Sequence, residues 1–210
     1  MAPVDSYFKA GYYSATMDKP SPKYYRTEAF FKAHDVKRVL DVGCGAGRHT
    51  YPLARAGFEV YGFDISKKAL AMNKSILKKY EVKAALVQLD MKKQWPYKKD
   101  FFDAVLASRS MYQFRVAEIK RNIQKVRRVL REGGYLFWEG PTYKTGRDLF
   151  LGEEMKTIEP GTWLSIGGPY DGNVYHRFKS KKEVLGFLNR FKIIRFDFRG
   201  KTFSLLAKKL

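Results

Sequence analysis

The sequence has one cysteine, Cys44, and it lacks long apolar runs and low-complexity segments. A single cysteine excludes an internal disulfide and a zinc site built from several cysteines. The apolar stretch around residues 101–107 is far shorter than the roughly 18 residues that a membrane-spanning helix needs. Residues 1–24 lack the basic stretch and apolar core of a secretory signal. These absences favour a soluble cytoplasmic protein that does not bind membranes.

Acidic residues are few compared with basic ones. The chain has 41 Lys and Arg against 21 Asp and Glu, a formal net charge of +20. The lysines occur as scattered pairs, such as Lys67-Lys68 and Lys208-Lys209, and not as one block. Two interpretations remain open. The lysines either coat a solvated surface, or they form a basic face that binds a polyanion such as nucleic acid.

Apolar segments that end at glycine or aspartate alternate with amphipathic segments along the chain. The pattern predicts helices at 25–34, 48–56, 67–79, 116–131 and 180–189, and strands at 38–42, 58–63, 82–89, 101–107, 135–138, 192–198 and 202–207. Gly133 and Gly134 are expected to end the fourth helix. The alternation predicts an α/β fold with a doubly wound, mostly parallel seven-stranded sheet and a C-terminal antiparallel hairpin.

A glycine-rich turn follows the first predicted strand. Ligands of doubly wound sheets bind at the carboxyl ends of the strands, and Gly43, Gly45 and Gly47 lie at such an end, just after Asp41. A dinucleotide fingerprint would need glycine where this chain has Arg48. A carboxylate beside exposed backbone amides suits a ligand that carries an ammonium and a carboxylate group.

Two more acids end the next predicted strands. Asp64 lies 21 residues beyond Gly43, the spacing at which an acid accepts hydrogen bonds from ribose hydroxyls. Asp90 can accept from an exocyclic amine, and Met91 can pack on a flat base. Together with Asp41, these residues could bind three parts of one ligand: an amino acid, a ribose and an adenine. S-adenosylmethionine contains all three.

The ordered motifs resemble those of class I S-adenosylmethionine-dependent methyltransferases. They lie at Val39–Gly47, Val60–Asp64, Leu89–Asp90, Phe102–Tyr112 and Val129–Gly134. The resemblance covers about residues 38–139 and is strongest to small single-domain enzymes of the tellurite-resistance and small-molecule types. It implies a Rossmann-like methyltransferase fold and S-adenosylmethionine as cofactor.

The resemblance also implies the cofactor contacts. The backbone of residues 43–47 would surround the methionine part of the cofactor. Asp64 would bind the ribose, and Asp90 and Met91 would hold the adenine. Ser108 would offer a carbonyl near the ammonium, and Arg26 would meet the carboxylate. The full predicted set is Asp41, Gly43, Cys44, Gly45, Gly47, Asp64, Ile65, Asp90, Met91, Ser108 and Arg26. Each acid could instead serve ordinary turn chemistry.

The chain is expected to form one methyltransferase domain. It divides into an N-terminal segment or lid at 1–36, a cofactor-binding core at 37–140, an acceptor-side lid insertion at 141–179, and a terminal helix and hairpin at 180–210. Long connections inside a compact domain are usually functional.

Methyl transfer requires alignment of the acceptor and, for some acceptors, a base. The candidate catalytic residues are His176, Tyr112 and Glu139. The candidate acceptor-binding residues are Tyr13, Arg109, Tyr143, Trp163 and Arg177. The alternative is that His176 forms hydrogen bonds within the lid and that the aromatic residues pack in the core.

The leading hypothesis is therefore an S-adenosylmethionine-dependent methyltransferase that acts on a small molecule, anionic if the arginines bind it, as a monomer or homodimer. The alternative is an RNA or protein methyltransferase that uses the basic surface. Residues 108–112 lack the Asn/Asp-Pro-Pro-aromatic element of enzymes that methylate exocyclic amines of bases. This absence counts against nucleic acid as the acceptor. A non-catalytic cofactor-sensing module is a third hypothesis.

Overall fold

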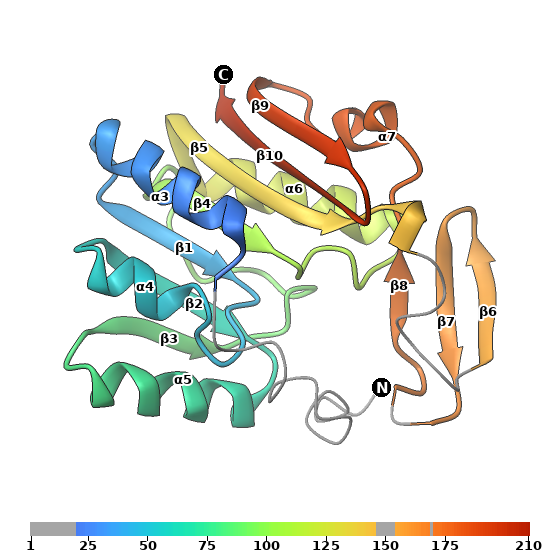
Figure 1. The fold of residues 1–210 in the computed structure, drawn as a ribbon, viewed down its shortest axis with the longest axis horizontal. Coiled ribbons are helices and arrows are strands. Elements are labelled where there is room, and N and C mark those ends of the chain that lie inside the picture. Colours follow the sequence, from blue (N-terminus) through green and yellow to red (C-terminus); the bar gives the residue numbers. More distant parts are fainter. Residues whose placement is uncertain (1–19, 146–153, 169) are drawn as a thin grey trace.

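The computed structural model describes residues 20–145, 154–168 and 170–210 (Figure 1). Its helices are α3 (Pro22–Ala33), α4 (Thr50–Arg55), α5 (Lys67–Lys79), α6 (Val116–Val129) and α7 (Lys181–Gly186), with a 3-10 turn at Tyr143–Thr145. Its strands are β1 (Arg38–Val42), β2 (Glu59–Asp64), β3 (Ala84–Gln88), β4 (Phe102–Ser108), β5 (Leu130–Pro141), β6 (Glu154–Glu159), β7 (Thr162–Ile166), β8 (Val174–His176), β9 (Phe191–Arg199) and β10 (Thr202–Lys209). No helix in these described ranges is long and apolar enough to cross a membrane.

Seven strands form one sheet in the order β3-β2-β1-β4-β5-β10-β9. The first five are parallel, and β10 pairs antiparallel with both β5 and β9. This arrangement confirms the predicted doubly wound sheet with its C-terminal hairpin. The strand order reverses between β1 and β4, so the crevice expected to hold a ligand lies at the carboxyl ends of these two strands.

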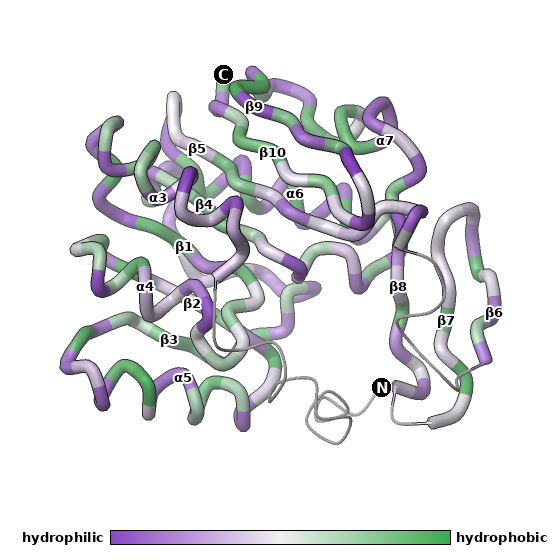
Figure 2. Tube along the Cα trace, in the orientation of Figure 1, coloured by the Kyte–Doolittle hydropathy of each residue, from purple (hydrophilic) through white to green (hydrophobic). Residues whose placement is uncertain are grey.

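Helices cover both faces of the sheet (Figure 1). On one face, Tyr24 and Phe31 of α3 and Leu53 of α4 share a buried cluster with side chains of β1 and β2. On the other, α6 and α7 bury an apolar cluster against β4, β5 and β10. Figure 2 shows hydrophilic residues recurring along the helices, as expected for helices with one solvated face.

The predicted end of the fourth helix was wrong. α6 ends at Val129, and Leu130 already begins β5, so Gly133 and Gly134 lie inside a strand and do not terminate the helix. A side chain at Gly134 would lie 3.0 Å from the Asp103 carbonyl, which explains the glycine by close strand packing. No helix was predicted between the strands at 82–89 and 101–107, and residues 89–101 contain none.

A separate three-stranded sheet, in the order β6-β7-β8, lies beyond the carboxyl ends of the main strands (Figure 1). The backbone amide of His176 in β8 donates to the Tyr112 carbonyl at 2.7 Å. The amide of Val116, at the start of α6, donates to Glu159 of β6 at 2.7 Å. Both contacts attach the small sheet to the loop that follows β4.

Candidate functional site

The glycine turn after β1 requires its glycines for both conformation and space. Gly43, Gly45 and Gly47 have φ angles of 69°, 52° and 100°. A Cβ on Gly43 would lie 2.5 Å from Ser110 Cβ, and one on Gly47 would lie 2.6 Å from Asn73 Oδ1. The side chains of Ser110, in the loop after β4, and of Asn73, on α5, therefore approach this turn closely.

Asp41 anchors a buried polar network beneath the turn. Thr50 Oγ1 donates to Asp41 Oδ2 at 2.8 Å, and Asn73 Nδ2 donates to Thr50 Oγ1 at 3.1 Å and to the Gly45 carbonyl at 3.3 Å. Burial raises the pKa of Asp41 to about 7, although the Thr50 hydrogen bond acts to lower it. A cationic group placed beside Asp41 would favour its ionised form.

Asp64 contacts the same turn from the end of β2. Its Oδ2 accepts from the Gly45 amide and its Oδ1 from the Ser66 amide, both at 2.9 Å. Burial raises the pKa of Asp64, and these amides oppose the rise. The neighbouring Ile65 side chain is 42% exposed, unusual for isoleucine, and offers an apolar surface beside Asp64. The structure thus places Asp41 and Asp64 around one loop.

Asp90 and Met91 follow β3, the strand next to β2. Asp90 Oδ1 accepts from the Lys92 amide at 2.8 Å in a local turn. Met91 is buried in the core, and its Cε lies 3.5 Å from the position a Gly43 Cβ would take. Met91 therefore packs against the glycine turn, and its contact with adenine stays a prediction.

Glu139, at the end of β5, is buried and held by two serines. Ser108 Oγ donates to Glu139 Oε2 at 2.7 Å, and Ser21 Oγ donates to Oε1 at 3.1 Å. Ser21 is the N-cap of α3, and its amide lies 3.5 Å from His49 Nε2. Burial lowers the pKa of His49 to about 3, with Arg48 and Arg109 adding to the effect. Glu139 thus joins α3 to β4 and β5.

Two predicted arginines are exposed at this end of the molecule. Arg109 follows β4 with a φ of 53°, a left-handed conformation that is uncommon outside glycine. Its amide donates to the Glu139 carbonyl at 3.0 Å. Arg26 lies on α3, one turn after Ser21. Cys44 is buried, and burial raises the pKa of its thiol well above the usual range, which suits a packing role.

His176 is fully buried with both ring nitrogens occupied. Nδ1 lies 2.7 Å from Thr162 Oγ1, and Nε2 lies 3.0 Å from Glu183 Oε1. Glu183 also accepts from the Lys179 amide at 2.6 Å. This geometry disagrees with the expectation of a catalytic base and matches the alternative, hydrogen bonding within the segment, because the ring joins β7 and β8 to α7.

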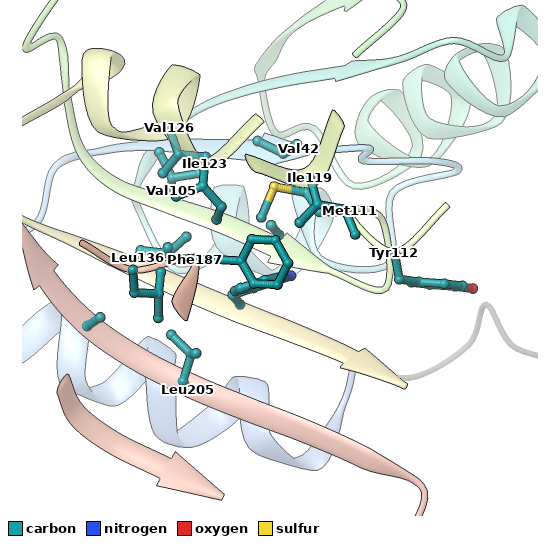
Figure 3. Close-up of a cluster of buried hydrophobic side chains, with 14 of the residues drawn as sticks. Val42, Val105, Met111, Tyr112, Ile119, Ile123, Val126, Leu136, Phe187 and Leu205 are labelled. Carbon is teal, nitrogen blue, oxygen red and sulfur yellow. The ribbon is translucent and has the colours of Figure 1, made fainter. Parts of the chain in front are cut away.

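Tyr112 lies at the edge of the core beside the small sheet. In Figure 3 its ring points away from the other labelled side chains. The Arg177 guanidinium carbon lies 5.7 Å from the Tyr112 ring centroid and 5.8 Å from that of Tyr175. Arg177 is itself buried, so it stabilises this aromatic pair by cation–π contact.

The remaining predicted acceptor residues lie in different places. Tyr143 is exposed, and its ring centroid lies 5.7 Å from that of Trp163 on β7. The structure therefore brings these two together near the start of the small sheet. Tyr13 lies outside the described residues.

Four residues of the network were missed by sequence reasoning: Ser21, Thr50, Asn73 and Ser110. Each is a polar residue that is buried in the structure. Asn73 could have been found from the sequence, because it shares the apolar face of its helix with Leu70 and Leu77. A polar residue on such a face is expected to have a buried partner. Ser21 could not be found in this way, since its partner Glu139 is 118 residues away.

Comparison with known proteins agrees with this geometry. Residues 39–134 match the family model described as "Methyltransferase domain". An uncharacterized methyltransferase of Synechocystis sp. is 34% identical over 98 residues, covering 47% of this chain and 44% of its own. A ubiquinone biosynthesis O-methyltransferase of Alkalilimnicola ehrlichii is 30% identical, covering 49% of this chain and 40% of its own.

The matches thus span less than half of these curated relatives. Among solved structures, an S-adenosylmethionine-dependent methyltransferase of Methanosarcina mazei has a TM-score of 0.74 at 24% identity, covering 92% of this chain and 99% of its own. That similarity shows the fold. Residues 39–134 are therefore similar to a methyltransferase domain, and the chain has the fold of solved S-adenosylmethionine-dependent methyltransferases.

Proposed function

We propose that this protein transfers a methyl group from S-adenosylmethionine to a small-molecule acceptor. The observation that carries the proposal is the pair Asp41 and Asp64 around one glycine turn, at the point where the strand order reverses. The cofactor supplies an electrophilic methyl group on a sulfonium. The protein then has to bind and orient both molecules and exclude water.

The residues at this edge fit that cofactor. Asp41 offers a buried carboxylate to an ammonium group, and Asp64 lies at the end of β2, where acids accept from ribose hydroxyls. Ser110 Oγ is buried beside Gly43 and has no hydrogen-bond partner among the described residues. A buried polar atom without a partner is costly, so a ligand atom that satisfies Ser110 would gain affinity.

The acceptor would bind beyond the ends of β4 and β5, under the β6–β8 sheet. Tyr112 would line this space, Arg109 would attract an anionic acceptor, and Glu139 would position the start of α3 through Ser21. His176 is excluded from this group by its buried partners. We propose that the acceptor is already nucleophilic, because the other predicted base, Glu139, is engaged by two serine hydroxyls.

The matched O-methyltransferase of ubiquinone biosynthesis supports a small-molecule acceptor. The test is incubation of the purified protein with methyl-labelled S-adenosylmethionine and separate small-molecule, RNA and protein fractions of a cell extract. We expect label in the small-molecule fraction, and at least a tenfold loss in Asp64→Asn, since a hydrogen bond to a charged group is removed. Label confined to RNA or protein would contradict the small-molecule acceptor.

A further inference from the structure

The two edge strands of the main sheet differ in how they are protected. Edge strands usually carry charged residues that prevent pairing with other chains. β9 carries Lys192, Arg195 and Arg199. β3 has the sequence Ala-Ala-Leu-Val-Gln and no charge, and its Val87 side chain is 40% exposed. Figure 2 shows hydrophobic residues along β3 and hydrophilic residues interrupting β9. The β3 edge is therefore open to an added strand.

An apolar groove of about 470 Å³ lies beside this edge. Its walls include Tyr61, Val87, Tyr97, Lys98 and Phe101. Residues 89–101 form no helix, and although Trp95 buries Phe63 of β2, the outer part of β3 on the α6 face stays partly exposed at Val87. It has the size and lining of a pocket for apolar side chains.

The aromatic walls of the groove pack edge to face. The Tyr61 ring makes interplanar angles of 86° with Phe101 and 84° with Tyr97, with centroids 5.4 and 6.3 Å apart. In each contact the edge of one ring meets the face of the other, so these rings do not form a parallel platform for stacking nucleic-acid bases. The groove favours aliphatic side chains.

The surroundings of the β3 edge are basic. α5 packs on the other face of β3 and carries five exposed lysines and no acidic residue. Lys98 lies in the groove wall. Glu81 and Asp90 flank β3 in the sequence, and the Asp90 carboxylate accepts from the Lys92 amide. Of the more distant acids, Glu59 pairs with Arg38, and Asp100 pairs with Lys209 at 2.8 Å. The lysines of α5 outnumber these acids. This charge favours an acidic partner and opposes pairing with a second copy, which would also carry +20.

We propose that the β3 edge binds an extended acidic segment of a partner protein, which adds a strand to the sheet. Backbone hydrogen bonds along β3 would supply affinity, and alternate apolar side chains would occupy the groove. The acidic side chains between them would face the lysines of α5. This proposal is independent of methyl transfer, since the site lies on a different edge from the glycine turn.

The test uses a fluorescein-labelled peptide of alternating valine and glutamate, with binding followed by anisotropy. We expect saturable binding by the whole protein. The same peptide with a central proline should bind about tenfold more weakly, because proline removes a ladder hydrogen bond and distorts the strand. Replacing its glutamates with lysines should abolish binding.

Val87→Lys separates groove binding from charge attraction. It adds a positive charge, so a purely electrostatic complex would strengthen, whereas loss of the apolar wall should weaken binding about tenfold or more. Ile194→Lys on β9, where the native side chain is 42% exposed, is the matched control and should leave affinity unchanged. Thermal unfolding verifies that both variants fold.

Several results would overturn the proposal. These are no peptide binding, equal binding of the proline peptide, or tighter binding by Val87→Lys. Displacement of the peptide by single-stranded oligouridylate at lower concentration would assign the surface to nucleic acid. A dimer in light scattering that Val87→Lys dissociates would assign it to self-association.

Discussion

Asp41 shows how one residue couples burial to binding. Its carboxyl is almost completely buried, and burial raises its pKa to about 7. An ammonium group beside it would lower that pKa, so ligand binding below pH 7 would release a proton from Asp41. His49 does not titrate in this range, because its pKa is lowered to about 3.

The affinity for S-adenosylhomocysteine should therefore rise with pH. Between pH 6 and pH 8 we expect an increase of about tenfold, from the ionisation of Asp41 alone. Asp41→Asn should bind more weakly at pH 8 and lose most of this pH dependence. Calorimetry at the two pH values measures both effects. An equally steep dependence in Asp41→Asn would contradict the role of Asp41.

The stability of the ligand-free protein, in contrast, should fall as pH rises. A folded-state pKa above the unfolded value contributes stability that is complete below about pH 4 and is lost as pH rises through about 7. His49 has the opposite effect on stability, because folding lowers its pKa. That effect acts only below the pKa of about 6.5 that His49 has in the unfolded chain. Asp41 thus destabilises the empty site most at pH 8, where it binds best.

Site residues that directly follow a strand could be predicted from the sequence. Asp41 and Asp64 were predicted because glycine spacing and strand boundaries are local signals. Met91 was predicted beside the adenine from its place after a strand, and the structure places its methyl group next to Gly43. Ser110 acquires its place only when β4 lies beside β1, which spacing along the chain does not reveal.

At the scale of elements, a buried histidine side chain joins the small β6–β8 sheet to α7. His176 links Thr162 of β7 to Glu183 of α7. Although burial acts to raise it, the pKa of Glu183 is lowered, mainly by its hydrogen bond to His176. Removing the imidazole would leave these two groups without that partner in a packed setting.

His176→Ala should lower the free energy of unfolding by about 2–3 kcal/mol. Lys182→Ala, at an exposed position on α7, is the control and should cost less than about 0.5 kcal/mol. Urea unfolding measures both. Wild-type stability in His176→Ala combined with a methyl-transfer loss above about a hundredfold would instead indicate a catalytic base.

Helix boundaries were predicted correctly where the sequence contains a clear capping residue. α5 spans the predicted residues because Ser66 accepts from the Ala69 amide, and β1 also matches its prediction. The end of α6 was missed because Leu130 enters β5 directly, without a glycine cap. The strands of the small sheet were not predicted, since they are short and interrupted by glycine turns at Gly161, Gly167 and Gly172.

For the whole molecule, topology explains why the site lies where it does. Five parallel strands point their carboxyl ends toward the glycine turn, the start of α3 and the β6–β8 sheet (Figure 1). The doubly wound parallel sheet and its terminal hairpin were predictable from the ordered motifs. The position of the basic helix α5 beside the uncharged edge strand β3 was not, because only the fold brings these two elements together.

The central claim is that Asp41, Asp64 and the glycine turn bind a sulfonium nucleoside as one site. Titration calorimetry with S-adenosylhomocysteine tests it most directly, comparing the wild type with Asp64→Asn and with Asp35→Asn, an exposed aspartate in the α3–β1 turn. We predict one-to-one binding that weakens about tenfold or more in Asp64→Asn and is unchanged in Asp35→Asn. No heat with the wild type, or equal affinities in all three proteins, would contradict the account.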